Sequence, residues 1–200
     1  MLMNILDLYK TTTYQEKYHF GNESYPAEPF WHAINSDDII KNWGDRIKNR
    51  PQNHKFWLHI NIPFCETKCS YCTHSVTAGN NLEIERYIQT LEGEMQEFSP
   101  YFKDVHFSSL YIGWWTPSLL TKEQLRDLYI YIKKYFNVAD IDFNMLEFSP
   151  STATEEKVIV AKENGVCRVT FWIQDISQEV LLKNGRLQTI DQIKTLVKHL

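Results

Sequence analysis

The sequence lacks the features that mark several classes of protein. Its 200 residues carry a net charge of −4, with no strongly basic face or acidic tail, so bulk charge gives no reason to expect a nucleic-acid partner. No apolar run approaches the roughly 18 residues of a membrane span. The apolar start of the chain, residues 1–7, is too short and lacks the basic residues that would predict a secretory signal. A globular composition remains, 43% hydrophobic, in a chain long enough for one sizeable core.

Cysteine is scarce, but three of the four cysteines stand together. Cys65, Cys69 and Cys72 have C-x3-C-x2-C spacing, whereas Cys167 stands alone. Closely spaced cysteines outside a disulfide-dense secreted scaffold favour metal binding over disulfides. Three thiolates can hold three irons of a [4Fe–4S] cubane, which leaves the fourth iron open to a small molecule. The alternative is a structural zinc site with His74 as fourth ligand.

From residue 56 onward, strand and helix patterns alternate. The expected strands cover residues 56–62, 106–112, 141–147 and 166–173. The expected helices cover residues 82–98, a segment after Thr121, residues 153–164, and a last apolar pattern from Ile190 to Leu200. Thr121 to Gln124 forms a capping box, and Gly165 suits the position after a helix end. Repeated strand–helix units predict a parallel sheet with right-handed crossovers.

The segment before residue 56 is polar and rich in tyrosine. We interpret residues 1–55 as an N-terminal extension of the main domain, with a short helix at 37–43. No fixed-period repeat or low-complexity run is present.

The motifs around and after the cysteines resemble one enzyme family. In chain order they are His59–Cys65 (HINIPFC), Leu110–Ser118 (LYIGWWTPS), Glu147–Pro150 (EFSP), Gly165–Val169 (GVCRV), Ile173–Asp175 (IQD) and Asn184–Arg186 (NGR). Their order and spacing resemble the radical SAM superfamily, in its oxygen-independent coproporphyrinogen III oxidase (HemN/HemW-like) branch. The resemblance implies an α/β fold, a partial parallel (β/α) barrel. About four βα units would lie in residues 56–200, a core incomplete at its C-terminus.

The resemblance also implies a set of site residues. Cys65, Cys69 and Cys72 would bind a [4Fe–4S] cluster. The residues matching positions near S-adenosylmethionine (SAM) are His59, Tyr71, Gly113, Trp114, Trp115, Thr116, Glu147, Gln174 and Arg186. Most of these motifs fall at the C-terminal end of an expected strand, the rim on which parallel α/β barrels build their sites. The cluster is oxygen-sensitive, so we expect a reducing, cytoplasmic setting.

Several of these residues have a plainer alternative. Tyr71 could serve only in packing, and His59 could be a hydrogen-bonded core residue. Arg186 could form a surface salt bridge. We expect Cys167 to be a core residue inside the fourth strand.

One departure from the family pattern changes the functional expectation. The family normally has G-G-G-T-P where this chain has Gly113 to Pro117 as GWWTP, and glycine at the position of Trp172. Glycine lets a backbone approach a ligand closely, and tryptophan does not. Indoles at Trp114, Trp115 and Trp172 are therefore expected to fill or distort the SAM pocket, unless they are buried aromatics that stabilise the barrel. The chain is then either a variant of the family whose SAM pocket is blocked or a degenerate relative of the family.

The family scaffold implies an oxidoreductase in which the cluster reductively cleaves SAM to a 5′-deoxyadenosyl radical. The implied partners are a small-molecule substrate such as a porphyrinogen or haem, and an electron donor such as flavodoxin or ferredoxin. The rival hypotheses are a non-catalytic iron–sulfur or haem-binding protein and a radical SAM methyltransferase relative. The tryptophans favour the first rival.

Overall fold

The computed structural model describes residues 35–74 and 77–199. The chain separates into two compact units, residues 1–41 and 42–200. Residues 1–34 of the expected extension lie outside the described residues, so a domain division at residue 56 stays a prediction. Helix α3 (Ser36–Lys48) is longer than the expected helix at 37–43. It runs across the boundary between the two units, and all other described helices and strands belong to the second unit.

A four-stranded parallel sheet forms the centre of the second unit, in the order β1-β4-β5-β6. The strands are β1 (Phe56–Asn61), β4 (Phe107–Gly113), β5 (Phe143–Phe148) and β6 (Arg168–Phe171). Each strand is followed by helix before the next parallel strand begins, as crossover connections require. The predicted α/β class with about four βα units is confirmed.

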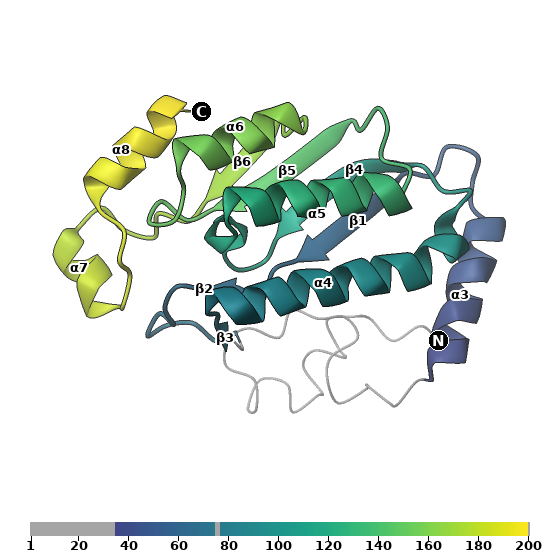
Figure 1. Cartoon of the computed structure of the whole chain (residues 1–200), viewed down its shortest axis with the longest axis horizontal. Coiled ribbons are helices and arrows are strands. Elements are labelled where there is room, and N and C mark those ends of the chain that lie inside the picture. Colours follow the sequence, from purple (N-terminus) through teal and green to yellow (C-terminus); the bar gives the residue numbers. More distant parts are fainter. Residues whose placement is uncertain (1–34, 75–76, 200) are drawn as a thin grey trace, which may run out of the picture. The chain divides into compact units, whose positions relative to one another are not determined.

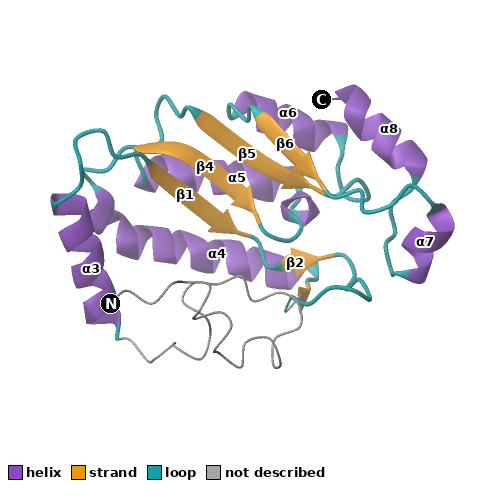
Figure 2. Cartoon of the chain, turned by 180° about the vertical axis from the view of Figure 1, so that it is seen from behind, coloured by secondary structure: helices purple, strands orange, loops and turns teal. Residues whose placement is uncertain are grey.

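Helices cover one face of this sheet, as the opposite views in Figures 1 and 2 show. The main covering helices are α4 (Asn81–Phe98), α5 (Lys122–Tyr135) and α6 (Glu155–Glu163), and α8 (Ile190–His199) packs beside α6. Their buried stripes meet the sheet in one core, which includes Ile84, Ile88, Met95, Leu125, Leu128, Ile132, Ile112, Leu146 and Phe148. The predicted helical periodicity therefore identified the faces that pack on the sheet.

Side chains alternate between the faces of a strand, so the face without covering helices receives His59, Tyr111 and Glu147. His59 is exposed there, and its ring stacks on Tyr111 with centroids 4.6 Å apart. The interpretation of His59 as a core residue is therefore wrong.

Several short elements differ from the predictions. Strand β6 is shorter than expected, because Val166 still closes the end of α6 by donating its N–H to the Ala161 carbonyl. Thr154 caps α6, so that helix begins at Glu155 rather than at residue 153. Unpredicted elements are α7 (Gln178–Lys183), β2 (Phe64–Cys65), β3 (Thr77–Ala78) and the 3₁₀ turns Ser99–Phe102 and Pro117–Leu119. All are too short to give a periodic pattern.

The prediction that Cys167 is a core residue inside a strand is also wrong. Its side chain is exposed and it precedes the first residue of β6. Strand β6 lies at the end of the described sheet, so no further strand covers its start. The thiol contacts the backbone of Asn144, whose N–H lies 3.3 Å from Sγ.

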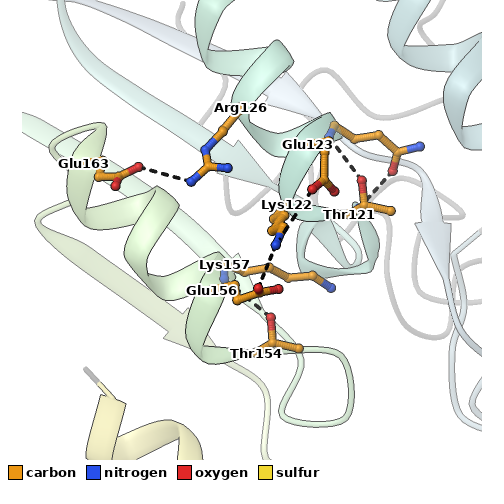
Figure 3. A network of polar contacts seen from close by, with 9 residues as sticks. Thr121, Lys122, Glu123, Arg126, Thr154, Glu156, Lys157 and Glu163 are labelled. Carbon is orange, nitrogen blue, oxygen red and sulfur yellow. Dashed lines mark hydrogen bonds and ion pairs between the residues drawn. The ribbon is translucent and has the colours of Figure 1, made fainter.

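Polar contacts fix the start of α5 and join it to α6 (Figure 3). Thr121 Oγ1 accepts from the Gln124 N–H at 3.1 Å, and Gln124 Oε1 accepts from the Thr121 N–H at 2.9 Å. The predicted capping box is confirmed. Lys122 pairs with Glu156 at 2.6 Å across the two helices. No helix within the described ranges is both long and apolar enough to cross a membrane.

The capping box gives a stability prediction. Replacing Thr121 with Ala leaves the Gln124 N–H without its side-chain acceptor and should cost about 1 kcal/mol of unfolding free energy. The matched control, Thr121→Ser, keeps the hydroxyl and should stay close to the wild type. Urea unfolding followed by circular dichroism measures both, and equal midpoints for the two variants would contradict the assignment.

Candidate functional site

The three clustered cysteines lie on the loop that follows β1. Cys65 ends the short strand β2, and the Cys72 N–H donates to the Cys69 carbonyl at 3.0 Å, which makes a tight turn between them. All three are free thiols of intermediate burial. Burial raises the pKa of the Cys65 thiol, while its hydrogen bond with Thr116 acts in the opposite direction.

A turn from far along the chain holds this loop in place. Thr67 Oγ1 donates to the Gly185 carbonyl at 2.7 Å. The Ser70 N–H and hydroxyl donate to the carbonyl and side-chain oxygens of Asn184, at 3.1 and 2.6 Å. Gly185 has a φ of +71°, a backbone conformation that glycine adopts without strain. The sequence identified Asn184–Arg186 as a motif but not its anchoring role.

The cysteines share one pocket with most of the predicted site residues. Its volume is about 270 Å³. It is lined by Cys65, Thr67, Cys69, Tyr71, Cys72, Thr73, His74, Trp114, Trp115, Thr116, Trp172, Gln174 and Arg186. The structure therefore gathers residues from the loops after β1, β4 and β6 at one edge of the sheet.

Glu147 connects to this pocket through its hydrogen bonds. It is 4% exposed at the end of β5. The Tyr111 hydroxyl donates to Oε1 at 2.6 Å, and the Trp114 N–H donates to Oε2 at 2.8 Å. Burial first, and then this carboxylate, raise the pKa of Tyr111 far above its ordinary value. One carboxylate oxygen thus bonds to a side chain of β4 and the other to the backbone of the turn that follows it.

The turn after β4 has a backbone conformation with positive φ, which glycine adopts easily, although the residue there is tryptophan. Trp114 has a φ of +95°, a region that bulky residues rarely adopt. The Tyr111 ring covers Gly113 so closely that an added Cβ there would lie 2.2 Å from a ring carbon. Gln174, on the loop after β6, also has a positive φ, +69°.

The three tryptophans line the pocket in different ways. Trp114 is 53% exposed and Trp172 is 52% exposed, so the interpretation of these two as buried aromatics is wrong. Trp115 is more enclosed, and its buried indole N–H has no hydrogen-bond partner among the described residues. The ring of His74 lies 5.9 Å from the Trp115 ring and 6.3 Å from the Trp114 ring.

Two side chains approach the cysteine sulfurs directly. Thr116, 8% exposed, places Oγ1 3.2 Å from Cys65 Sγ. Arg186 places Nη1 3.9 Å from Cys69 Sγ, and its Nη2 donates to the Trp172 carbonyl and to Gln188 Oε1. Within residues 35–74 and 77–199 Arg186 forms no ion pair, so the alternative of a surface salt bridge does not hold there.

Tyr71 and Gln174 lie at a second opening beside Arg186. Burial, and then its contact with Cys69, raise the pKa of Tyr71 to about 12. The ring of Tyr71 is nevertheless exposed.

Lys157 supports the site and was missed by the sequence reasoning. Its Nζ donates to the Ser118 carbonyl at 2.7 Å and to the Thr152 carbonyl at 2.9 Å, which joins the loops after β4 and β5. Burial lowers its pKa. No sequence signal distinguishes this lysine from its exposed neighbours on α6.

Similarity to known proteins agrees with this architecture. Residues 60–200 match the model of the radical SAM superfamily. The oxygen-independent coproporphyrinogen-III oxidase-like protein HemZ of Bacillus subtilis is 33% identical over 141 residues, which cover 68% of this chain and 28% of that protein. The heme chaperone HemW of the same organism is 31% identical over 130 residues, which cover 64% of this chain and 34% of that protein.

The solved structure of coproporphyrinogen III oxidase (HemN) from Escherichia coli, described as a radical SAM enzyme, has a similar fold. It matches with a TM-score of 0.77 at 25% identity, over 97% of this chain and 42% of that chain. This chain thus spans less than half the length of each of these three proteins. Since the family model covers most of the chain and the fold agrees, the chain belongs to the radical SAM superfamily and is similar to its HemN and HemW members.

Proposed function

We propose that this protein is an iron–sulfur protein of the radical SAM class, whose [4Fe–4S] cluster is held by Cys65, Cys69 and Cys72. The observation that carries the proposal is the single pocket in which these three thiols meet side chains from the loops after β4 and β6. That edge of a parallel sheet is where such folds build their sites.

The donor set fits a cubane cluster. Three thiols provide three of the four iron ligands, and they leave one iron for a small molecule. A zinc ion instead needs its ligands around one point. The C-x3-C-x2-C spacing and the match to the radical SAM family support the cluster over a zinc site that uses His74.

When bound, the cluster would supply the electron for reductive cleavage of SAM, the reaction for which the family is named. Gln174 and Arg186 line the pocket and offer hydrogen-bond donors for the ribose and the carboxylate of SAM, and Tyr71 stands where the family often has an aromatic residue near the adenine. Glu147 is the residue that resembles the family's SAM-binding carboxylate. Here Glu147 bonds to Tyr111 in β4 and to the backbone N–H of Trp114 in the turn that follows.

The tryptophans lead us to propose that SAM binding is impaired in this chain. The turn keeps the backbone conformation that glycine allows, as the φ of Trp114 shows. The obstacle is therefore the volume of the indoles of Trp114, Trp115 and Trp172, all of which line the pocket. Close-packed sites accept such volume only by excluding a ligand or moving the wall.

The substrate proposal is a porphyrinogen or haem, because HemZ and HemN are named for coproporphyrinogen III oxidase and HemW is named as a heme chaperone. The proposed electron donor is a flavodoxin or ferredoxin. A second candidate function is a non-catalytic iron–sulfur or haem-binding protein, and the tryptophan-lined pocket favours it. A methyltransferase role has no specific support in the described residues.

The first prediction concerns cluster assembly. Anaerobic reconstitution of the full protein should give close to four irons per chain, and Cys69→Ala should abolish this because it removes one of only three iron ligands. Cys167→Ala is the matched control. It removes an exposed thiol outside the pocket and should leave the iron content unchanged. Tightly bound zinc without visible absorption in the wild type would contradict the proposal.

The second prediction separates the catalytic from the non-catalytic function. The reconstituted wild type should bind SAM weakly and turn over negligibly. The combined variant Trp114→Gly, Trp115→Gly and Trp172→Gly removes the indole volume and should increase SAM affinity at least tenfold. Isothermal titration measures binding, and chromatography of 5′-deoxyadenosine measures cleavage. If the wild type cleaves SAM as fast as the variant, the steric argument is wrong.

A further inference from the structure

Two of the cysteine sulfurs have polar side chains next to them, and the two neighbours differ in kind. Cys65 faces the hydroxyl of Thr116, whereas Cys69 faces the guanidinium of Arg186. These two contacts come from different parts of the chain, the loop after β4 and the turn after α7. Such groups around an iron–sulfur cluster are one of the main means by which a protein sets its reduction potential.

The hydroxyl of Thr116 lies within hydrogen-bond distance of the Cys65 sulfur. Thr116 is buried, and its backbone N–H donates at 3.1 Å to the carbonyl of Phe64, the residue before Cys65. The side chain is therefore held beside the sulfur at 3.2 Å. A cysteine that ligates iron is a thiolate and has no proton to donate. In the loaded protein the threonine hydroxyl must consequently be the donor.

Arg186 is held beside Cys69 by neutral partners. Its guanidinium donates to the Trp172 carbonyl and to Gln188 Oε1, and Gln188 is itself 1% exposed. Gln188 is fixed in turn, because its Nε2 donates to the Ile173 carbonyl. In the part of the chain that the structure describes, Arg186 forms no ion pair, so the groups that hold its guanidinium beside the sulfur are neutral.

We infer that Thr116 and Arg186 are positioning residues that donate hydrogen bonds to the thiolates of Cys65 and Cys69, and that they raise the reduction potential of the cluster. This inference rests on the proposed function, since it presupposes the cluster. Reduction adds negative charge that spreads onto the sulfur ligands. A donor or a positive charge next to those sulfurs stabilises the reduced state more than the oxidised state. The cluster then becomes easier to reduce by a cellular electron donor.

The test is the midpoint potential of the cluster in the reconstituted full protein. It is measured without SAM, in a redox titration monitored by electron paramagnetic resonance. Thr116→Val keeps the shape of the side chain but removes the donor, and it should shift the potential to more negative values. Arg186→Met keeps much of the length but removes the charge, and it should shift the potential in the same direction. Iron content is measured for every variant.

Two matched controls separate these effects from structural damage. Thr116→Ser retains the hydroxyl, and Arg168→Met removes a different cation, one that lies over the Phe143 ring and outside the cysteine pocket. Both should have the wild-type potential. Fully loaded Thr116→Val and Arg186→Met proteins with the wild-type potential would overturn the inference and leave the proposed cluster intact.

If the variants do not assemble the cluster, a measurement on the wild-type protein still tests the inference. Resonance Raman spectra of the iron–cysteine stretching modes in H₂O and D₂O should differ, because a deuteron replaces the hydroxyl and guanidinium protons bonded to the thiolates. Identical spectra would overturn the inference. A wild-type protein that binds no iron would overturn the proposed function itself, so the two failures can be told apart.

Discussion

The site depends on one constraint of the fold, the parallel direction of β1, β4, β5 and β6. Because parallel strands end at the same edge, the loops that follow them emerge side by side although they are far apart in the sequence. Crossover helices make this possible by returning the chain to the start of the next strand, and they cover one face of the sheet as they do so (Figure 2). The cysteine loop is held at that edge by hydrogen bonds to Asn184 and Gly185, which lie more than 100 residues further along the chain.

The turn after β4 shows how a site can keep its backbone while its side chains change. A positive φ at a residue other than glycine costs roughly 1–3 kcal/mol and persists only when its surroundings impose it. At Trp114 the buried carboxylate of Glu147 accepts the backbone N–H, and the Tyr111 ring packs against the preceding glycine. A charge-assisted hydrogen bond of this kind offsets part of the cost. The glycine-type turn therefore survives, and the indole is directed toward the pocket.

Much of this architecture follows from local patterns. The capping box at Thr121 and the apolar stripes of α4 and α5 are short-range features, so they were predictable within a residue or two. Cys167 was assigned wrongly because hydrophobicity alone does not say that the residue precedes β6 and is exposed. Helix α7 was missed because six residues are too few to show a period. Yet α7 ends in the turn that anchors the cysteine loop.

The sequence by itself determined the family, the strand–helix alternation and the three thiols, because each of these is encoded in residue types at short spacing. It also indicated that indoles replace glycines at the rim. Only the tertiary structure decided which groups face the sulfurs. Thr116 and Arg186 lie 51 and 117 residues from the cysteines they contact, and no local pattern specifies such pairs. Their meeting results from sheet order and loop docking, which depend on the packing of the whole chain and not on any one segment.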